Sequence, residues 1–492
     1  MQSFPENIYS VASVREMDRV AIEEFGIPGY TLMQRAAAAA LEFARDRFPT
    51  RRRWQVICGS GNNGGDGYVL ARLAAKEGIT ASVVSLVDPE SLSGDAATAY
   101  DDFVHGGGVV RPWAGSLDDD AELLVDAILG SGLQREVDGE FAAAVAAINN
   151  HAAPVHALDI ATGIHGDSGH VMGCAVEAQL TTTFVGLKPG LFLANGPDYC
   201  GEISFDGLSI DSAVSDGLAA VFRCLDEETL AHWLQPRRKA AHKGDFGHVL
   251  VIAGGPGMAG AAHLCGAAGL RTGAGRVSVA THPDHAATIS GNCPELMARA
   301  VAGHDDLQPL LETADVIAFG PGLGQTEWAR GLVADVAAAE QPSVWDADAL
   351  NLLSAAPDRN AQRIITPHPG EAATLLSRTS AEVQGDRKQA LLDLQAQFGG
   401  VAVLKGAGTL VSAASGAPWL SRFGNPGMAA PGMGDVLTGI VAAMLAQGLP
   451  LELAAAIGVY IHARAGDRAA TGGQRGMIAS DLINALRGVV NP

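Results

Sequence analysis

Short apolar runs alternate with helix-like segments along most of the 492-residue chain, and this alternation limits the fold more than any other feature. In the first half the runs are WQVIC, ASVVSLV, LLVDAI and VHALDI. In the second half they are HVLVIAG, GRVSVAT, DVIAFG, SVWDAD, RIITPH and VAVLKG. Such runs joined by helices predict βαβ units with parallel sheets, whose ligand crevice lies at the carboxyl ends of the strands.

The chain is too long for one ordinary domain, and polar, turn-rich sequence between Asp206 and Arg238 separates the two sets of strands. We therefore predict two α/β domains, over residues 1–214 and 215–492. The first is expected to be a Rossmann-like, three-layer domain with a parallel sheet. Val11 to Arg47 is expected to be helical, with a break at Gly26 to Gly29. We find no internal repeat.

Charge and composition exclude several classes of function. A net charge of −21 argues against nucleic-acid and anionic-membrane surfaces, although local glycine loops can still bind phosphate. No apolar run reaches the roughly 18 residues of a membrane span, and the N-terminal sequence lacks an apolar signal core. Six scattered cysteines without a C-x-x-C favour a reducing compartment over disulfides or a metal cage. We expect a cytoplasmic protein.

The loop CGSGNNGGDGYVLAR is the most informative motif of the first half. Three of its glycines have the dinucleotide-binding spacing G-x-G-x-x-G, namely Gly59, Gly61 and Gly64. This spacing fits either a plain glycine-rich turn or a coenzyme site in which Asp88 binds the ribose. The loop also carries three polar side chains that neither requires: Asn62, Asn63 and Asp66. Their oxygen atoms indicate a hard cation or a bound polar ligand.

The segments VREMDRVAIEEFGIPGYTLMQRAA, GSGNNGGDGYVLAR, VDAILGSGLQRE and LDIATGIHGD resemble, in this order, the NAD(P)H-hydrate epimerase family over roughly residues 10–210. The resemblance implies that the hydrated dinucleotide binds to one loop of Asn62, Asn63, Gly64, Gly65 and Asp66. It implies that the substrate phosphate binds to a second loop of Gly130, Ser131, Gly132, Leu133, Gln134, Arg135 and Glu136. It also implies a K⁺ ion bound by oxygen atoms of Asn63, Asp126 and Thr162.

Epimerisation inverts the ring carbon that bears the added hydroxyl, which requires a proton donor and acceptor beside the ring. The resemblance places Asp159 against the substrate near that ring, and we interpret it as the acid/base. Lys188 in GLKPG is a second candidate, or else a strand-end lysine in water. Asp126 could instead cap the next helix. The chain departs from the family at Ala161-Thr162, where proline and serine are usual; threonine keeps the hydroxyl.

NPGMAAPGMGDVLTG is the corresponding motif of the second half. Gly432, Gly434 and Asp435 precede an apolar helix, whose first backbone N–H groups can form an anion hole for a moving phosphoryl group. Asp435 can accept a proton from the attacking hydroxyl. The alternative is a plain N-cap aspartate.

The ordered segments KGDFGHVLVIAGGPGMAGAAHLCGAAGLRTGAG, GPGLG, DADALNLL, TPHPGEAATLL, LKGAGTLVS and GNPGMAAPGMGDVLTG resemble the ADP/ATP-dependent NAD(P)H-hydrate dehydratases, which have the ribokinase-like fold. The match covers roughly residues 243–480. It implies substrate contacts from Ala261, Gly322, His368 and Asp435. It implies nucleotide contacts from Lys405, Gly406, Ala407, Gly408, Thr409 and Gly434. His368 could instead be a core or capping histidine. The family usually has threonine or serine and then glycine at Ala430-Pro431.

With both halves matched, the chain resembles the bifunctional hydrate-repair enzymes. ADP or ATP would phosphorylate the ring hydroxyl, with Mg²⁺ bridging the donor phosphates, and phosphate would then leave. The resemblance suggests ADP for prokaryotic members, but the sequence does not choose between the two. Two alternatives remain: a small-molecule kinase with a fused domain, and a non-enzymatic dinucleotide-binding module. We also expect a homo-oligomer.

Overall fold

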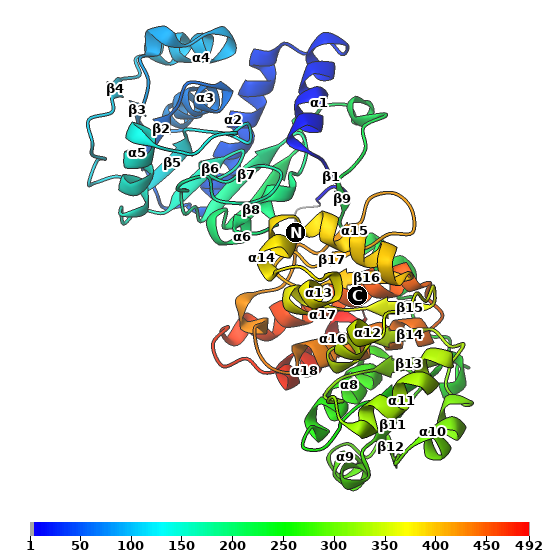
Figure 1. The fold of residues 1–492 in the computed structure, drawn as a ribbon. Coiled ribbons are helices and arrows are strands. Elements are labelled where there is room, and N and C mark those ends of the chain that lie inside the picture. Colours follow the sequence, from blue (N-terminus) through cyan, green and yellow to red (C-terminus); the bar gives the residue numbers. More distant parts are fainter. Residues whose placement is uncertain (1–3, 492) are drawn as a thin grey trace. The chain divides into compact units, whose positions relative to one another are not determined.

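The computed structural model describes residues 4–491, and its contacts divide the chain into two compact units, residues 1–222 and 223–492. Each unit is a layered α/β fold built on a largely parallel sheet, which confirms the predicted fold class (Figure 1). Among the described residues, no helix is long and apolar enough to span a membrane.

The first unit is built on a seven-stranded parallel sheet of order β4-β3-β2-β5-β6-β7-β8. Its strands are β2 (Arg53–Cys58), β3 (Thr80–Ser85), β4 (Val110–Pro112), β5 (Leu123–Ala127), β6 (Val155–Leu158), β7 (Leu180–Phe184) and β8 (Glu202–Asp206). Its main helices are α1 (Val11–Glu23), α2 (Gly29–Arg47), α3 (Asn62–Lys76), α4 (Gly94–His105) and α5 (Gly139–Asn149), with the single turn α6 (Gly196–Tyr199). The short β1 (Asn7–Ile8) forms a parallel bridge to Leu187.

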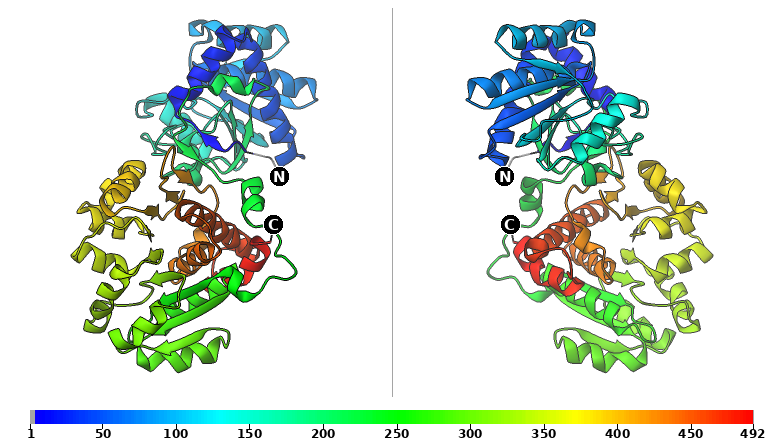
Figure 2. Two further views of the ribbon diagram at one scale, coloured as in Figure 1. Left: turned by 90° about the vertical axis from the view of Figure 1, so that its right-hand side faces the viewer. Right: turned by 90° about the vertical axis from the view of Figure 1, so that its left-hand side faces the viewer.

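Helices lie on both faces of this sheet, as Figure 2 shows, so that the unit has the predicted three layers. The central strands β5 and β6 are buried along their whole length, which explains why they read as continuous apolar runs rather than as alternating ones. The predicted break in the N-terminal helix is confirmed, because α1 ends at Glu23 and α2 begins at Gly29.

The second unit contains a larger sheet, whose strands run in the order β9-β18-β17-β16-β15-β14-β13-β10-β11-β12. The parallel part consists of β10 (His248–Ile252), β11 (Arg276–Thr281), β12 (Met297–Ala300), β13 (Val316–Phe319), β14 (Ser343–Trp345), β15 (Arg363–Ile365) and β16 (Val401–Leu404). Antiparallel pairing joins β16 to β17 (Leu410–Val411) and β17 to β18 (Trp419–Leu420), and β9 (Phe222–Arg223) pairs with β18.

Twelve helices of the described chain belong to this second unit. They are α7 (Glu227–Trp233), α8 (Ala259–Thr272), α9 (Ala286–Asn292), α10 (His304–Leu311), α11 (Glu327–Ala338), α12 (Asp348–Ala355), α13 (Pro369–Leu376), α14 (Ser380–Gly385), α15 (Arg387–Phe398), α16 (Met433–Ala446), α17 (Leu451–Ala469) and α18 (Ala479–Val489).

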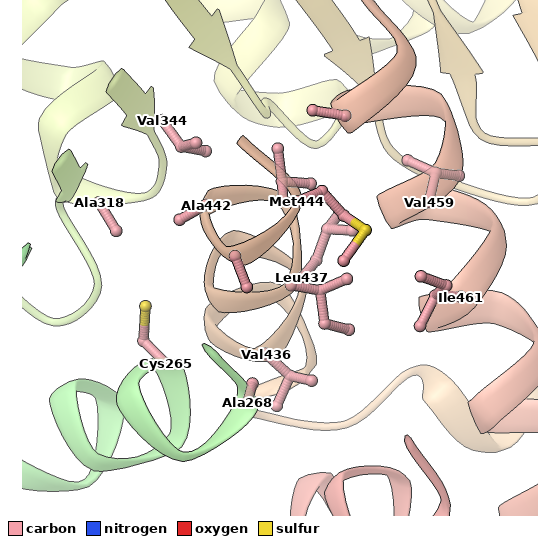
Figure 3. Close-up of a cluster of buried hydrophobic side chains, with 14 of the residues drawn as sticks. Cys265, Ala268, Ala318, Val344, Val436, Leu437, Ala442, Met444, Val459 and Ile461 are labelled. Carbon is pink, nitrogen blue, oxygen red and sulfur yellow. The ribbon is translucent and has the colours of Figure 1, made fainter. Parts of the chain in front are cut away.

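Helix α16 forms the centre of this unit's core, between α8, α17 and the sheet (Figure 3). Its side chains are apolar around most of its circumference, as expected for a helix that is buried on all sides. Gly439 permits the close approach to α8, since a Cβ there would lie 2.1 Å from the carbonyl oxygen of Cys265. This packing fixes the start of α16, and with it Asp435, beside the carboxyl ends of the parallel strands.

Candidate active sites

A cavity of about 660 Å³ opens at the carboxyl edge of the first sheet. Its wall is formed by the loops after β2, β5 and β6, by α1 and α2, and by the turn that follows β7. The structure therefore brings together most of the residues predicted from the first half, including Asn62, Asn63, Asp66, Asp159 and Lys188. The predicted phosphate loop lines the same cavity from Gly130 to Arg135.

Three predicted substrate residues, Gly64, Gly65 and Glu136, are not among those that line the cavity. The two glycines instead allow the first turn of α3 to pack tightly. A Cβ on Gly64 would lie 2.2 Å from the carbonyl oxygen of Gly59, and one on Gly65 would lie 2.5 Å from the Met33 methyl carbon. They shape the site through the backbone.

Asp159 and Lys188 form a buried ion pair in the cavity wall. Lys188 Nζ lies 2.5 Å from Asp159 Oδ1 and also donates hydrogen bonds to Thr183 Oγ1 and the Phe184 carbonyl. Its side chain is almost completely buried, so the alternative of a strand-end lysine in water is wrong. The backbone N–H of Ser131 donates to Asp159 Oδ2. Burial opposes ionisation of Asp159, but Lys188 outweighs it and lowers the pKa of that carboxyl.

Asp126 and Thr162 form a second buried pair beneath the cavity. The Thr162 hydroxyl donates to Asp126 Oδ1 at 2.7 Å, and the Thr162 N–H donates to Oδ2 at 2.8 Å. Asp126 lies within β5 and not before a helix, so the alternative of a helix cap is wrong. Burial raises the pKa of Asp126 to about 6, against the opposing effect of these hydrogen bonds. Close to the cavity wall, both polar side-chain atoms of buried Asn63 lack a hydrogen-bond partner.

Three further carboxyl groups line the cavity, those of Asp18, Asp66 and Asp95. Burial is the largest cause that raises the pKa of Asp66 well above its usual value, followed by the charges of Asp159 and Asp18. Burial likewise raises the pKa of Asp18 to about 6, although Lys188 acts in the opposite direction. The sequence had indicated Asp66 but not Asp18, which lies on α1, more than forty positions before the glycine loop.

The coenzyme reading of the glycine loop fails at Asp88. Its carboxylate accepts a hydrogen bond from the Glu90 N–H in a short exposed turn, and it is not among the residues that line the cavity. The cavity wall also contains a positively charged side chain that sequence reasoning missed, that of Arg15. Arg15 on α1 lies against the phosphate loop, since a Cβ on Gly132 would be 2.0 Å from Arg15 Nη2.

In the second unit, the predicted nucleotide residue Lys405 forms a buried ion pair with Asp346. Lys405 Nζ lies 2.7 Å from Asp346 Oδ1, and the Thr438 hydroxyl donates to Asp346 Oδ2 at 2.9 Å. Asp346 directly follows β14 and Lys405 directly follows β16, so the two side chains meet at the carboxyl edge of the sheet. Burial opposes both charges, yet the pair lowers the pKa of Asp346 and, together with Glu371, raises that of Lys405.

Asp435 lies in the first turn of α16, close to this ion pair. The N-cap of the helix is Gly432, which has φ of 87°, so the reading of Asp435 as a plain N-cap is wrong. Burial, followed by the charge of Asp346, raises the pKa of Asp435 to about 6 against the effect of Lys405. Gly434 brings its backbone against the pair, because a Cβ there would lie 3.3 Å from both Asp346 Oδ2 and Lys405 Nζ.

The other predicted contacts of this unit lie on neighbouring loops. Ala261 and Gly322 meet each other: a Cβ on Gly322 would lie 2.8 Å from the Ala261 Cβ. His368 is the N-cap of α13, where its Nδ1 accepts hydrogen bonds from the Gly370 and Glu371 N–H groups. The structure thus shows the capping role that the sequence left open for His368. Its imidazole is more than half exposed.

The loop Lys405 to Thr409 is held by an arginine that sequence reasoning missed. Arg387 is 5% exposed, and its Nη2 donates to the carbonyl oxygens of Leu404, Lys405 and Gly408. No motif singles out this residue, which begins α15. Asp346, by contrast, had a usable signal, because it directly follows a buried strand in SVWDAD, as Asp159 does in VHALDI.

The fold and the two sites define a two-unit α/β enzyme, and each unit has a buried aspartate–lysine ion pair in its site. A family model described as NAD(P)H-hydrate dehydratase matches residues 249–487, and one described as YjeF-related protein N-terminus matches residues 29–190. A bifunctional NAD(P)H-hydrate repair enzyme from Coxiella burnetii is 46% identical over 99% of this chain and 99% of its own length. One from Escherichia coli is 42% identical over 100% of this chain and 95% of its own length.

Two solved structures resemble the second unit. A ribokinase-like superfamily protein from Enterococcus faecalis is 30% identical, with a TM-score of 0.50, and covers 55% of this chain and 95% of its own. A hypothetical protein from Streptococcus mutans is 29% identical, with a TM-score of 0.51, and covers 54% of this chain and 98% of its own. The ribokinase-like fold of the second unit is therefore confirmed. The chain belongs to the family of bifunctional NAD(P)H-hydrate repair enzymes.

Proposed function

We propose that this enzyme repairs hydrated NAD(P)H in two steps. The first unit interconverts the R and S epimers of the hydrate, and the second dehydrates the S epimer to NAD(P)H at the expense of ADP or ATP. The observation that carries the proposal is the meeting, in one cavity, of the oxygen-rich loop around Asn63, the phosphate loop at Ser131 and the Asp159–Lys188 pair. A plain coenzyme site would not require that combination.

In the first unit, the ring nitrogen's electron pair can expel the hydroxyl from the adjacent carbon, and water can return to the opposite face. Asp159 is proposed to face this carbon as an ionised carboxylate, with Lys188 holding it in place. The backbone N–H groups of the loop from Gly130 to Glu136 would bind the substrate phosphate, together with the nearby side chain of Arg135. Asn62 and Asp66 would bind the dinucleotide.

A K⁺ ion fits the oxygen atoms beneath this cavity. Asn63 presents a buried amide oxygen without a partner, and Asp126 and Thr162 place two further oxygen atoms 2.7 Å apart. An unpartnered buried amide is costly, so a cation or a substrate group at this point would satisfy it. Bound there, K⁺ would attract electron-rich substrate oxygens. The family departure at position 161 leaves the required Thr162 hydroxyl in place.

In the second unit, Asp435 is proposed to take the proton from the ring hydroxyl as that oxygen attacks the terminal phosphate of the nucleotide. Gly434 and the loop Lys405 to Thr409 would bind the nucleotide, and Ala261, Gly322 and His368 the hydrate. The ring nitrogen then expels phosphate, a far better leaving group than hydroxide. Mg²⁺ would neutralise the phosphates of the donor nucleotide. Such an ion is commonly bound by these phosphates together with one or two protein carboxylates.

An assay with mixed hydrate epimers and either ADP or ATP tests both halves. The wild type should consume both epimers, release phosphate and restore the absorbance of the reduced cofactor. Asp435→Ala should abolish dehydration but retain epimerisation, whereas Asp159→Ala should leave one epimer unconsumed. A stable phosphorylated product would instead favour the small-molecule kinase, and full dehydration by Asp435→Ala would refute the proposed base.

Three further expectations stay predictions. Comparing ADP and ATP as donors decides the phosphate source, and it also shows whether Ala430-Pro431 weakens nucleotide binding. Light scattering of the purified protein tests the expected homo-oligomer. Cell fractionation tests the expected cytoplasmic location.

A further inference from the structure

We propose that Asp18, on α1, is the proton donor to the departing ring hydroxyl in the first unit, with the ionised Asp159 as its partner. This inference rests on the proposed epimerase function of that unit. It adds a catalytic residue from an N-terminal helix to a pocket whose other proposed catalytic groups, Asp159 and Lys188, come from the carboxyl edge of the sheet.

The geometry of α1 directs one of its faces into the cavity. Val14, Asp18 and Ile22 follow one another at intervals of four residues, which places them on one face of the helix, and all three line the cavity. The adjoining side of α1 is anchored by buried Met17 and Ala21. At the start of the helix, the Val11 N–H donates to Asp167 Oδ1 at 2.8 Å. The position of Asp18 is therefore set by the packing of its helix.

The carboxyl group of Asp18 is not used to hold neighbouring elements together. Within the described part of the chain, no group donates a hydrogen bond to it. Asp18 is only partly buried and lines the cavity, so its carboxyl group is available there to a ligand. A bound substrate hydroxyl would be its hydrogen-bond partner.

Burial raises the pKa of Asp18, whereas Lys188 lowers that of Asp159. Lys188 and Asp159 face it from the far wall, and Asp66 faces it from α3. The turn η3 (Ser212–Ser215), which packs on α1, has the sequence SAVS and brings no ionisable side chain. Lys188 bonds directly to Asp159 only. The pKa of Asp18 is raised to about 6, mainly by burial, whereas that of Asp159 is lowered.

Asp66 is a less suitable donor than Asp18. Its pKa is raised well above the ordinary value, chiefly by burial, so its proton is held more tightly than that of a solvated carboxyl group. General acids work best when their pKa lies near the working pH, because the group must both carry a proton and release it. Among Asp18, Asp66 and Asp159, Asp18 comes nearest to this condition.

The proposed step balances in protons and electrons. The ring nitrogen's electron pair forms a C=N⁺ bond as the C–O bond breaks, and the departing oxygen takes the proton of Asp18 and leaves as water. Water then adds to the opposite face, its proton passes to Asp159, and the electron pair returns to nitrogen. Proton exchange with solvent moves the proton from Asp159 back to Asp18. No oxidant, reductant or further reactant is needed.

The test compares Asp18→Asn with Glu16→Gln in the full-length protein, using hydrated NADH as substrate. Glu16 lies on the same helix but forms an exposed ion pair with Arg19, so its variant should behave as wild type. Asp18→Asn should lower the kcat of epimerisation by about 100-fold or more, a typical general-acid contribution, with little change in KM. Wild-type activity should fall as pH rises through about 6, and this limb should vanish in Asp18→Asn.

Asp18→Glu keeps a carboxyl group and should recover part of the lost rate together with the pH limb, which a merely structural role would not require. Dehydration of the S epimer by the second unit should be unchanged in every variant. Epimerisation by Asp18→Asn at the rate and with the pH profile of Glu16→Gln would overturn the assignment of Asp18. A wild-type protein that dehydrates the S epimer but does not interconvert epimers would instead overturn the proposed epimerase function, and the assignment with it.

Discussion

Replacement of Lys188 by methionine is a direct test of the ion pair in the first unit. Methionine has a similar length and no charge, so the cavity wall keeps most of its volume. The variant loses the 2.5 Å contact to Asp159 Oδ1 and the hydrogen bonds to Thr183 and Phe184. Asp159 then keeps only the hydrogen bonds of Ser131, from its N–H and its side chain, for a largely enclosed negative charge.

The expected loss of stability is large, because removal of one partner from a buried pair leaves the other charge uncompensated. Such removals cost about 3–5 kcal/mol. For a unit of roughly 200 residues, each kcal/mol lowers the melting temperature by about 2–4 °C, so the expected shift is roughly 6–20 °C. The shift should be confined to the first unit, where the pair lies.

Hydrogen exchange of first-unit peptides, together with calorimetry of the full chain, measures this effect separately in each unit. Lys76→Met is the matched control, since Lys76 is exposed at the end of α3. The double variant Lys188→Met/Asp159→Asn removes both charges and should be more stable than Lys188→Met alone. Asparagine suits this position, because residue 159 has φ of 67°, a left-handed conformation that asparagine tolerates.

The pH dependence of the stability loss in Lys188→Met shows whether the Lys188–Asp159 ion pair stabilises the folded state. In the wild type, Lys188 lowers the folded-state pKa of Asp159, so the pair's contribution is present above the unfolded pKa and is lost as pH falls through the folded one. In Lys188→Met, burial is opposed only by the Ser131 hydrogen bonds and should raise the folded-state pKa of Asp159, so stability falls as pH rises. The difference between variant and wild type should therefore widen from pH 5 to pH 8. A small, pH-independent difference, equal to that of Lys76→Met, would refute the reasoning.

Three other substitutions probe the remaining contacts. Thr162→Val removes the hydroxyl that bonds Asp126; it should cost about 1–3 kcal/mol and abolish any stimulation of epimerisation by K⁺ over Na⁺. Gly434→Ala places a methyl group 3.3 Å from both charges of the Lys405–Asp346 pair, and steady-state kinetics should show slower dehydration with epimerisation intact. Arg387→Met frees the carbonyls of the Lys405 loop, so calorimetric titration should show at least about tenfold weaker ADP binding.

The sequence predicted those site residues that directly follow strands. Asp159 stands immediately after β6, where the rule that ligand sites lie at the carboxyl ends of parallel strands predicted it. Lys405 was implied by the family resemblance, and it stands immediately after β16, in agreement with the same rule. Asp346 obeys the same rule and could have been found in this way. The alternation of apolar runs was likewise sufficient for the fold class, because short continuous apolar runs that alternate with helices are typical of parallel strands buried on both faces.

Asp18 and Arg387 could not be found in this way, because both lie in helices. A helix brings a side chain to a site only through its tertiary packing, and one sequence does not state which helix faces which loop. The spacing of Val14, Asp18 and Ile22 shows a common face but not what that face meets. The role of Arg387 depends on three backbone carbonyls more than fifteen positions away, which carry no signature in the side chains.

The two units share an electrostatic arrangement although their sequences share no motif. In each, a lysine that follows a strand pairs with an aspartate that follows another strand, as Lys188 does with Asp159 and Lys405 with Asp346. The paired carboxyl has a lowered pKa, and a helix brings up a second carboxyl whose pKa is raised to about 6. Environments that separate the pKa values of two carboxyl groups in this way indicate which group stays charged and which one carries the proton.

In the second unit the proposed proton carrier is Asp435, which the glycine-rich motif had already indicated as the base. The same reasoning applied to the first unit selects Asp18 rather than Asp159, since Asp159 is the member held ionised by its lysine. The two assignments stand on one physical argument but on different residues. If Asp18→Asn and Asp435→Asn both remove a pH limb near 6, each from its own half-reaction, the common arrangement is the cause. If only Asp435→Asn does so, the first unit uses its ion pair differently.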